Sequence, residues 1–142
     1  MRQVITLILV LALSVCTVIA TDFDNNDVEP VHPEYAGIAQ NLVNITLTSG
    51  NVKCSGMTIV KQNYYVSIAW KLQMTSSLNS NDFSTIETWT DNGFGLHTFG
   101  LEKYRAATHG HAYRLLEEIN VYTSNGSFVE RVNQASTVIR YS

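Results

Sequence analysis

Three histidines are the residues with the clearest metal-ligand character in this sequence. His109 and His111 are separated by Gly110, and side chains at positions i and i+2 of a strand project from the same face. Two imidazoles on one face can share a divalent metal ion, and His97 could supply a third nitrogen from a neighbouring strand. Because Gly110 favours a loop as readily as a strand, a protein without any cofactor is the competing expectation.

Glu117 and Glu118 raise the question of paired carboxylates that act as acid and base. Adjacent residues point to opposite faces of a strand, or lie about 100° apart on a helix, so the two cannot face one substrate bond. We interpret both as solvent-facing residues. The sequence has no Gly-x-Ser-x-Gly motif, so a nucleophile elbow of that kind is not predicted. We expect a protein that is not an enzyme, with a metal-dependent enzyme at the histidines as the alternative.

Aromatic residues recur through the chain, and most of them are expected in the core. Tyr65 lies in the opposite phase to Trp70 in an alternating segment. If Trp89 and Tyr104 are also exposed, the three rings would form a platform for a sugar ring, a lipid headgroup or a partner protein.

The first twenty residues have the pattern of a secretory signal peptide. Met1-Arg2-Gln3 is a short basic start, residues 4–15 are almost uninterruptedly apolar, and small or aliphatic residues precede Ala20. We expect cleavage after Ala20. The apolar run is shorter than the roughly 20 residues that a spanning helix needs, so no transmembrane anchoring is expected. The predicted location is secreted and extracellular.

Two N-glycosylation sequons become relevant if the protein is secreted. Asn44-Ile45-Thr46 and Asn125-Gly126-Ser127 are candidate N-glycosylation sites. Cys54 is the one cysteine beyond residue 20, so no intrachain disulfide is predicted for the mature chain. Its thiol is either buried or forms an intermolecular bridge that links a dimer.

Charge limits the class of partner. The sequence holds 9 Lys and Arg against 12 Asp and Glu, for a formal net charge of −3, and no basic run occurs. A nucleic-acid partner is therefore not expected. Residues 21–37 are acidic and carry no Lys or Arg, which is typical of a disordered arm. The remaining residues 38–142 are of the length expected for a single domain.

Period-two alternation dominates the sequence from residue 42 onward. Val43, Ile45 and Leu47 alternate with polar residues, and the segment 64–74 alternates over eleven residues. Turn signals predict hairpins at 49–51, 91–93 and 124–126. Gly56 interrupts the alternation of residues 52–60, which predicts a β-bulge there.

Residues 111–119 are ambiguous. Ala112, Leu115, Leu116 and Ile119 have the spacing of an amphipathic helix, yet the odd-numbered residues from Tyr113 also alternate. We favour a short helix that runs into a strand at 119–123. The predicted fold is mainly β: an antiparallel sandwich or open barrel of seven or eight strands, with room for one short helix. The alternative is an α+β fold in which residues 101–118 form a helix on an antiparallel sheet.

These observations give three hypotheses for function. The first is a secreted, glycosylated, non-catalytic protein that binds an extracellular protein, a glycan or a small ligand. The second is a metal-binding protein or metal-dependent enzyme that uses His109 and His111. The third is a membrane-binding or lipid-binding β protein that works through exposed aromatic residues.

Overall fold

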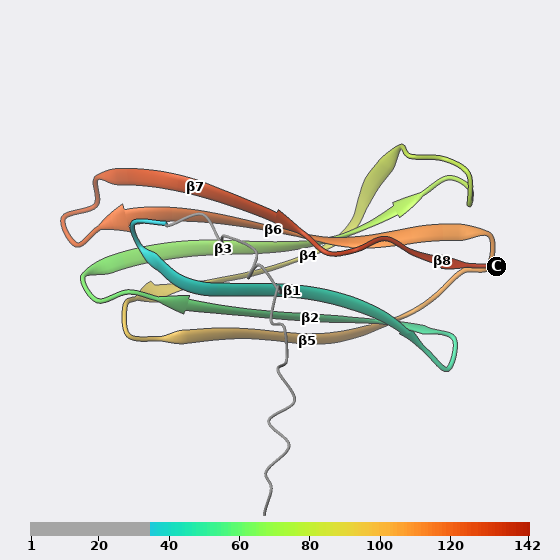
Figure 1. The fold of residues 1–142 in the computed structure, drawn as a ribbon, viewed down its shortest axis with the longest axis horizontal. Helices are drawn as coiled ribbons and strands as arrows, with labels where there is room; N and C mark the ends of the chain where they lie inside the picture. Colours follow the sequence, from blue (N-terminus) through green and yellow to red (C-terminus); the bar gives the residue numbers. More distant parts are fainter. Residues whose placement is uncertain (1–34) are drawn as a thin grey trace, which may run out of the picture. The chain divides into compact units, whose positions relative to one another are not determined.

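The computed structural model describes residues 35–142, which form eight β-strands and no helix. Figure 1 shows the strands running side by side along the long axis of this domain. The prediction of a mainly β, antiparallel sandwich is confirmed. The predicted signal peptide and residues 21–34 of the predicted acidic arm lie outside the described residues.

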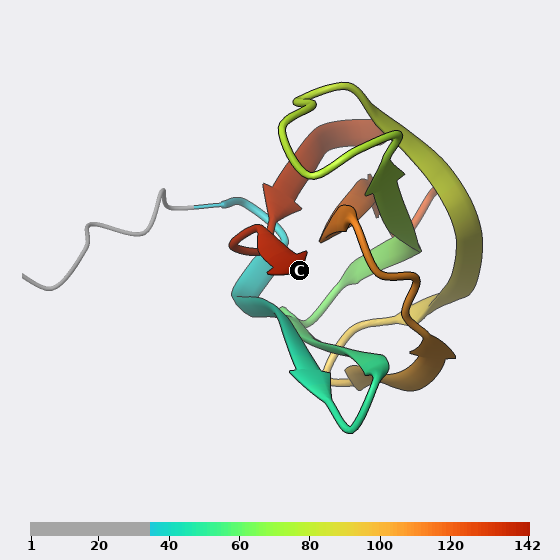
Figure 2. The same cartoon turned by 90° about the vertical axis from the view of Figure 1, so that its right-hand side faces the viewer.

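The strands form two antiparallel sheets, named sheet A and sheet B. Sheet A has the order β1 (Ile38–Thr48), β2 (Asn51–Val60) and β5 (Thr98–Ala106). Sheet B has the order β4 (Phe83–Phe94), β3 (Tyr64–Thr75), β6 (His111–Thr123) and β7 (Phe128–Ala135), and β8 (Ile139–Tyr141) also pairs with β6. Viewed along the strands in Figure 2, the two sheets lie around a common core.

Period-two alternation places the core as expected. Val66, Ile68, Trp70 and Leu72 of β3 are at most 2% exposed, while the residues between them face outward. Val43 and Ile45 of β1 pack against the same core. Burying each large apolar side chain stabilises the fold by about 1.5 to 3 kcal/mol, which is why the alternation determines which face of each sheet turns inward.

The predicted helix at 111–119 is wrong, because these residues belong to β6. β6 lies between β3 on one side and β7 and β8 on the other. Its backbone groups are therefore satisfied by neighbouring strands, and Tyr113, Leu115 and Ile119 are buried at a period of two. Tertiary pairing outweighs a helix propensity that amounts to only tenths of a kcal/mol per residue. The α+β alternative, which needs a helix over 101–118, is wrong for the same reason.

The predicted hairpin at 91–93 is also wrong. Asn92 and Gly93 stay within β4, in register with Ser67 and Val66 of β3. The chain turns later, at 95–97, where Leu96 has a φ of +55° and the Gly95 amide donates to the Tyr64 carbonyl at 2.8 Å. It then enters β5 in the other sheet, so β4 and β5 do not pair as a hairpin. The turn at 124–126 is confirmed.

The predicted bulge near Gly56 is wrong, since β2 keeps a continuous register with both β1 and β5 along residues 51–59. Position 56 faces inward, in phase with Cys54 and Thr58. A Cβ atom at Gly56 would lie 2.6 Å from Nε1 of Trp70. The glycine therefore makes room for the indole ring.

The connections form a Greek key. The chain crosses between sheets at 61–63, 95–97 and 107–110, so that β5 pairs with β2 and β6 pairs with β3. Tyr113, near the start of β6, accepts a hydrogen bond from the Thr108 amide at 2.7 Å. The Tyr113 side chain thus closes the corner that leads into β6. A β-sandwich hosts many functions and does not identify one.

Cys54 is completely buried in β2. The buried-thiol interpretation is confirmed, and a bridge to a second chain would require the two sheets to separate. Burial, with a smaller contribution from the Glu87 carboxylate, raises the pKa of the Cys54 thiol to about 11.

We expect Cys54 to resist alkylation in the folded protein. At pH 8 almost no thiolate is present and the sulfur is shielded from solvent, so iodoacetamide should react only after the sheets open. Mass spectrometry of protein treated with and without 6 M urea measures this. Rapid labelling of the native chain would contradict the burial, and the labelling rate in urea is the control for reagent activity.

Candidate functional site

The outer face of sheet B carries four aromatic side chains in one line across four strands. Phe94 of β4 is in register with Tyr65 of β3, Tyr65 with Tyr122 of β6, and Tyr122 with Phe128 of β7. We call these four residues the aromatic row. Side chains at paired positions of neighbouring strands are close enough to contact one another, so the register alone brings the rings together.

Each ring in the aromatic row contacts the next. The ring centroids of Tyr65 and Phe94 are 5.2 Å apart, those of Tyr65 and Tyr122 are 6.0 Å apart, and those of Tyr122 and Phe128 are 5.8 Å apart. All three pairs are tilted or edge-to-face, which is the favourable arrangement for aromatic quadrupoles. The end rings stay accessible to solvent, since Phe94 is 60% exposed and Phe128 is 58% exposed.

A shallow cavity of about 220 Å³ lies beside the aromatic row. Three of its lining residues belong to the row: Tyr65, Phe94 and Tyr122. Its other side is the β6–β7 turn, contributed by Thr123, Ser124 and Gly126. The cavity thus combines aromatic walls with two hydroxyl-bearing residues at its edge. It is smaller than the pockets of about 300 to 1,000 Å³ that hold drug-sized ligands, so it suits one small ring.

Polar side chains occupy the next position along each strand. Ser67 is in register with Asn92 and Asn120, and Asn120 with Arg131. We call these four residues the polar rung. Residues two apart on a strand are separated by roughly 7 Å, so the polar rung lies about one sugar ring from the aromatic row.

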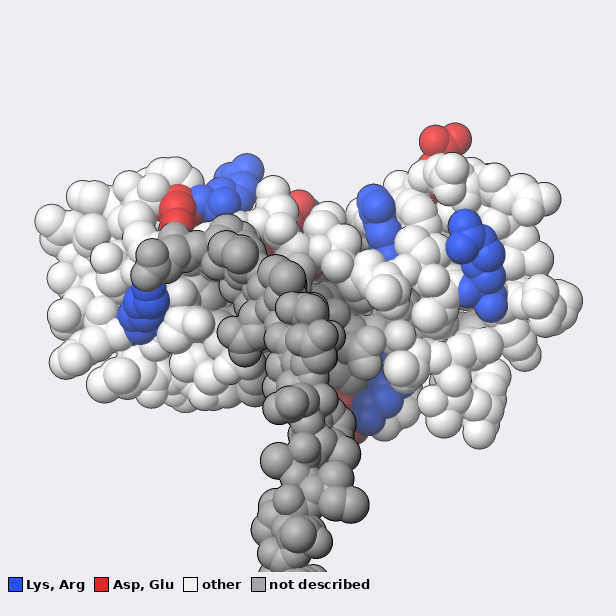
Figure 3. All heavy atoms as spheres, viewed as in Figure 1, with Lys and Arg blue, Asp and Glu red and all other residues white. Residues whose placement is uncertain are grey.

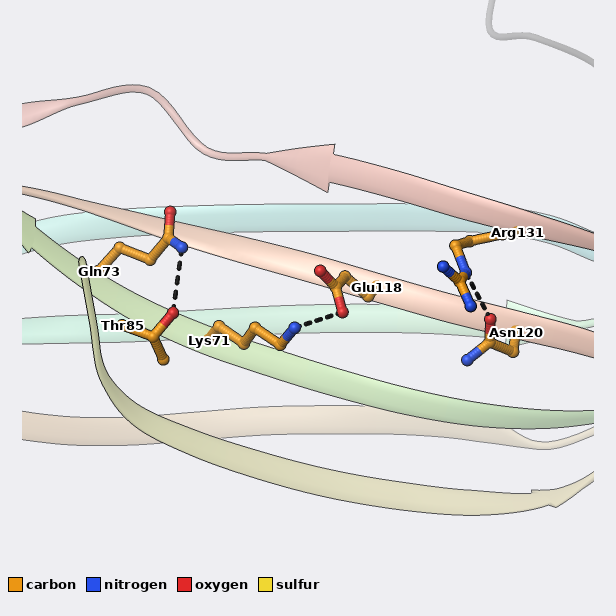
Figure 4. A network of polar contacts seen from close by, with 6 residues as sticks. All are labelled: Lys71, Gln73, Thr85, Glu118, Asn120 and Arg131. Carbon is orange, nitrogen blue, oxygen red and sulfur yellow. Dashed lines mark hydrogen bonds and ion pairs between the residues drawn. The ribbon is translucent and has the colours of Figure 1, made fainter. Parts of the chain in front are cut away.

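Figure 4 shows polar contacts on this face of sheet B, beginning at the polar rung. Arg131 Nε donates to Asn120 Oδ1 at 2.8 Å, and Lys71 Nζ lies 2.5 Å from Glu118 Oε2. Farther along, Gln73 Nε2 donates to Thr85 at 3.1 Å. The face therefore offers a row of rings followed by fixed donors and acceptors.

The structure separates the three aromatic residues that the sequence suggested as a platform. Tyr65 is in the aromatic row, on the outer face of sheet B. Trp89 is opposite Trp70 in the register of β3 and β4 and packs against the core. Tyr104 is 57% exposed on β5 in sheet A, where Lys53 Nζ lies 5.5 Å from its ring centroid.

The three histidines do not meet. His97 lies at one end of sheet A, where its carbonyl accepts from Val60 at the end of β2, and its ring packs on Phe99 at 4.7 Å. His109 and His111 lie beyond the opposite end of β5. The nine-residue length of β5 therefore separates them from His97. Within residues 35–142, no group of three or more His, Cys, Asp or Glu side chains could hold a metal ion.

His109 and His111 also differ from each other. His109 lies in the turn before β6, exposed, with its ring 5.3 Å from Tyr141. His111 begins β6, and its Nδ1 lies 2.6 Å from the Thr75 carbonyl oxygen. Since that nitrogen is already engaged, only Nε2 of His111 is left for a ligand. A metal site that uses this pair stays a prediction.

The interpretation of Glu117 as a solvent-facing residue is wrong. Its side chain is 0% exposed between the two sheets, whereas Glu118 faces outward. Glu117 Oε1 accepts from Thr58 Oγ1 at 2.6 Å and from Trp70 Nε1 at 2.9 Å, and Oε2 accepts from Asn41 Nδ2 at 3.3 Å. Burial raises the pKa of the Glu117 carboxyl, while these three hydrogen bonds act in the opposite direction.

An unpaired acceptor belongs to the residue in register with Glu117. Gln134 of β7 is the register neighbour of Glu117, and its Oε1 is the one buried side-chain oxygen in residues 35–142 without a hydrogen-bond partner. A protonated Glu117 has the donor that this oxygen lacks. The hydrogen bonds of Glu117 to Asn41 and Thr58 join β6 to β1 and β2 of sheet A.

Sequence reasoning missed three residues of the aromatic row: Phe94, Tyr122 and Phe128. Tyr65 alone was identified, because its strand was predicted correctly. A turn at 91–93 would separate Phe94 from the strand that pairs with Tyr65, and the turn signal at 124–126 does not by itself give the register of Tyr122 and Phe128. A register drawn across the 124–126 turn would have placed Tyr122 beside Phe128.

The two sequons lie on different sheets. Asn44 is exposed on β1, in register with Ser55 of β2 on the outer face of sheet A. Asn125 is exposed in the β6–β7 turn, next to the residues that line the cavity. Both positions are accessible to modification.

Charged side chains are scattered on the face drawn in Figure 3, where Lys and Arg do not gather into a broad patch. Among residues 35–142, no helix of the length and apolarity needed to cross a membrane occurs. No protein-family model and no curated protein sequence matches the chain.

Proposed function

We propose that this protein is exported, loses residues 1–20, and acts as a non-catalytic extracellular binding protein that takes carbohydrate on the outer face of sheet B. The observation that carries the proposal is the aromatic row, with its cavity and the adjacent polar rung. The signal-peptide pattern of residues 1–20 and the two exposed sequons support an extracellular location.

Carbohydrate fits the chemistry of this face. A pyranose ring has C–H groups on one side, which carry partial positive charge and are attracted to the negative face of an aromatic ring. Its hydroxyl groups need donors and acceptors. Ser124 provides a hydroxyl at the cavity, and in the polar rung Asn120 and Arg131 keep an amide and guanidinium nitrogens beyond the one hydrogen bond that they share.

A lipid surface is the second candidate, because exposed apolar side chains continue past the row. Leu96, two residues beyond Phe94, is 76% exposed. Exposed apolar residues at one end of a domain can enter the interfacial region of a bilayer. The polar rung argues against a lipid surface, because its polar side chains lie on the same face as the rings and would have to enter the bilayer with them.

We expect Phe94→Ala to weaken saccharide binding by about tenfold, because it removes a ring contact worth about 1 to 1.5 kcal/mol. Phe94 is 60% exposed, so the fold should be kept. Binding is measured on immobilised extracellular oligosaccharides and by titration of the best one. Tyr104→Ala is the matched control, since Tyr104 is 57% exposed on the other sheet.

Equal loss of binding in Tyr104→Ala would contradict the assignment to sheet B. Neutral and anionic vesicles are tested beside the saccharides. Binding to vesicles, and to no saccharide, would replace carbohydrate with a lipid surface as the ligand.

A further inference from the structure

The β6–β7 turn holds the second sequon directly beside the aromatic row. The Thr123 amide donates to the Ser127 carbonyl at 2.9 Å, and the Gly126 amide donates to the Thr123 carbonyl at 2.9 Å. Gly126 has a φ of +87°, which glycine adopts without strain. Tyr122 and Phe128 are paired residues on either side of this tight turn, and Asn125 lies midway between them in the sequence.

The Asn125 side chain is held in a defined position with its nitrogen free. Its Oδ1 accepts from the Ser127 amide at 3.3 Å and from the Thr123 hydroxyl. In the described part of the chain, no hydrogen bond engages Nδ2, the atom that accepts a glycan. The residue is exposed, so the modifying enzyme can reach it.

A sugar attached at this nitrogen leaves the turn at the edge of the cavity. Thr123, Ser124 and Gly126, which surround Asn125 in sequence, line that cavity together with Tyr122. Phe128 exposes 58% of its surface and contacts Tyr122 edge-on at 5.8 Å. The exposed ring of Phe128 is therefore open to a sugar that extends from this turn.

We propose that Asn125 carries an N-linked glycan whose first N-acetylglucosamine packs on Tyr122 and Phe128 of the same chain. In the transfer, Asn125 Nδ2 bonds to C1 of the sugar and loses a proton. The bond from C1 to the diphosphate of a polyisoprenoid-linked oligosaccharide breaks, and the diphosphate leaves with the bonding electrons. The inference rests on the export proposed above, and it leaves Tyr65 and Phe94 as the rings of the aromatic row that are open to a ligand.

Asn44 provides a matched comparison within the same molecule. It is also exposed and part of a sequon, but its register partner across β2 is Ser55, and the next residue on β5 in that line is Glu102. No aromatic residue stands in that line. A glycan at Asn44 is therefore expected to add nothing to stability through ring contacts.

The test uses the full chain expressed in cells that glycosylate secreted proteins. Mass spectrometry gives the occupancy of both sequons, and thermal unfolding gives Tm. We expect an occupied Asn125, and Asn125→Gln should lower Tm by about 4 °C through loss of the ring contact. Asn44→Gln should leave Tm nearly unchanged. An endoglycosidase that leaves one N-acetylglucosamine should preserve the effect, because only the first sugar touches the rings.

The Phe128→Ala background shows whether the rings are responsible. In the Phe128→Ala background, Asn125→Gln should lower Tm by much less than in the wild-type background, because one of the two ring contacts is already absent. An equal loss in both backgrounds, or a bare Asn125 on a secreted chain, overturns this inference and leaves the proposed export intact. A chain retained in the cytosol with residues 1–20 attached overturns the export itself.

Discussion

Replacing Glu117 with alanine is expected to lower the free energy of unfolding by about 3 kcal/mol. The substitution leaves the Trp70 indole N–H and the Thr58 hydroxyl buried without their acceptor, and each such group costs about 1 to 3 kcal/mol. It also opens a cavity between the sheets, because Glu117 is completely buried. Urea unfolding measures the loss, and Glu118→Ala on the exposed side of β6 is the matched control.

Glu117→Gln separates the charge from the packing. The amide keeps the side-chain volume and one oxygen acceptor for Thr58 and Trp70. At low pH, Glu117→Gln should therefore lower the free energy of unfolding much less than Glu117→Ala does. It cannot ionise, which makes it the reference for the pH dependence of the wild type.

The pH dependence follows from the raised pKa of Glu117. An unfolded glutamate titrates near its ordinary pKa of 4.5, whereas the folded group holds its proton to higher pH. The stability that Glu117 contributes is thus fully present below pH 4.5 and is lost as pH rises through the folded pKa. Unfolding free energies measured from pH 4 to 8 should show the wild type losing stability relative to Glu117→Gln. An increase of the wild type relative to Glu117→Gln would show that the folded protein prefers the charged carboxylate.

Gly56→Val should destabilise the protein by about 3 kcal/mol, at the upper end of the cost of overpacking a core. A Cβ at position 56 would lie 2.6 Å from Trp70 Nε1 and 3.1 Å from Trp70 Cδ1. The indole cannot move aside easily, because it is 2% exposed and its Nε1 donates to Glu117. The two γ-methyl groups of valine would add to this steric overlap with the indole ring.

Thermal unfolding of Gly56→Val and Gly100→Val tests this prediction. Gly100 lies on β5 of the same sheet, with no atom within 4 Å of an added Cβ. Its replacement should cost little, or even stabilise, since valine suits an exposed strand position. If both variants lost the same stability, the close approach of Trp70 to Gly56 would not be the cause.

Local sequence pattern was sufficient where a strand alternates cleanly. The segment 64–74 predicted both the existence of β3 and the face that it buries, because period-two burial is recorded in the residue types themselves. The 124–126 turn was equally clear, since Gly126 needs a positive φ. The mainly β, antiparallel class follows from these local signals alone.

Pattern failed where the partner strand decides the outcome. Residues 111–119 suit a helix by composition, yet pairing with β3, β7 and β8 satisfies their backbone as a strand. Asn92 and Gly93 have the composition of a hairpin turn, but β4 continues through them because β3 offers partners to its end. Glu117 looked like a surface residue because nothing in its sequence neighbourhood shows Thr58 or Trp70.

Residue types and their spacing are enough for the antiparallel β class, for most strand positions and for the location of both sequons. The aromatic row and the polar surroundings of Glu117 become visible only in the folded chain. Register across the four strands of sheet B brings the rings together, and packing of that sheet on sheet A brings Thr58 and Asn41 to Glu117. Register depends on the summed pairing of whole strands, and no single segment encodes it.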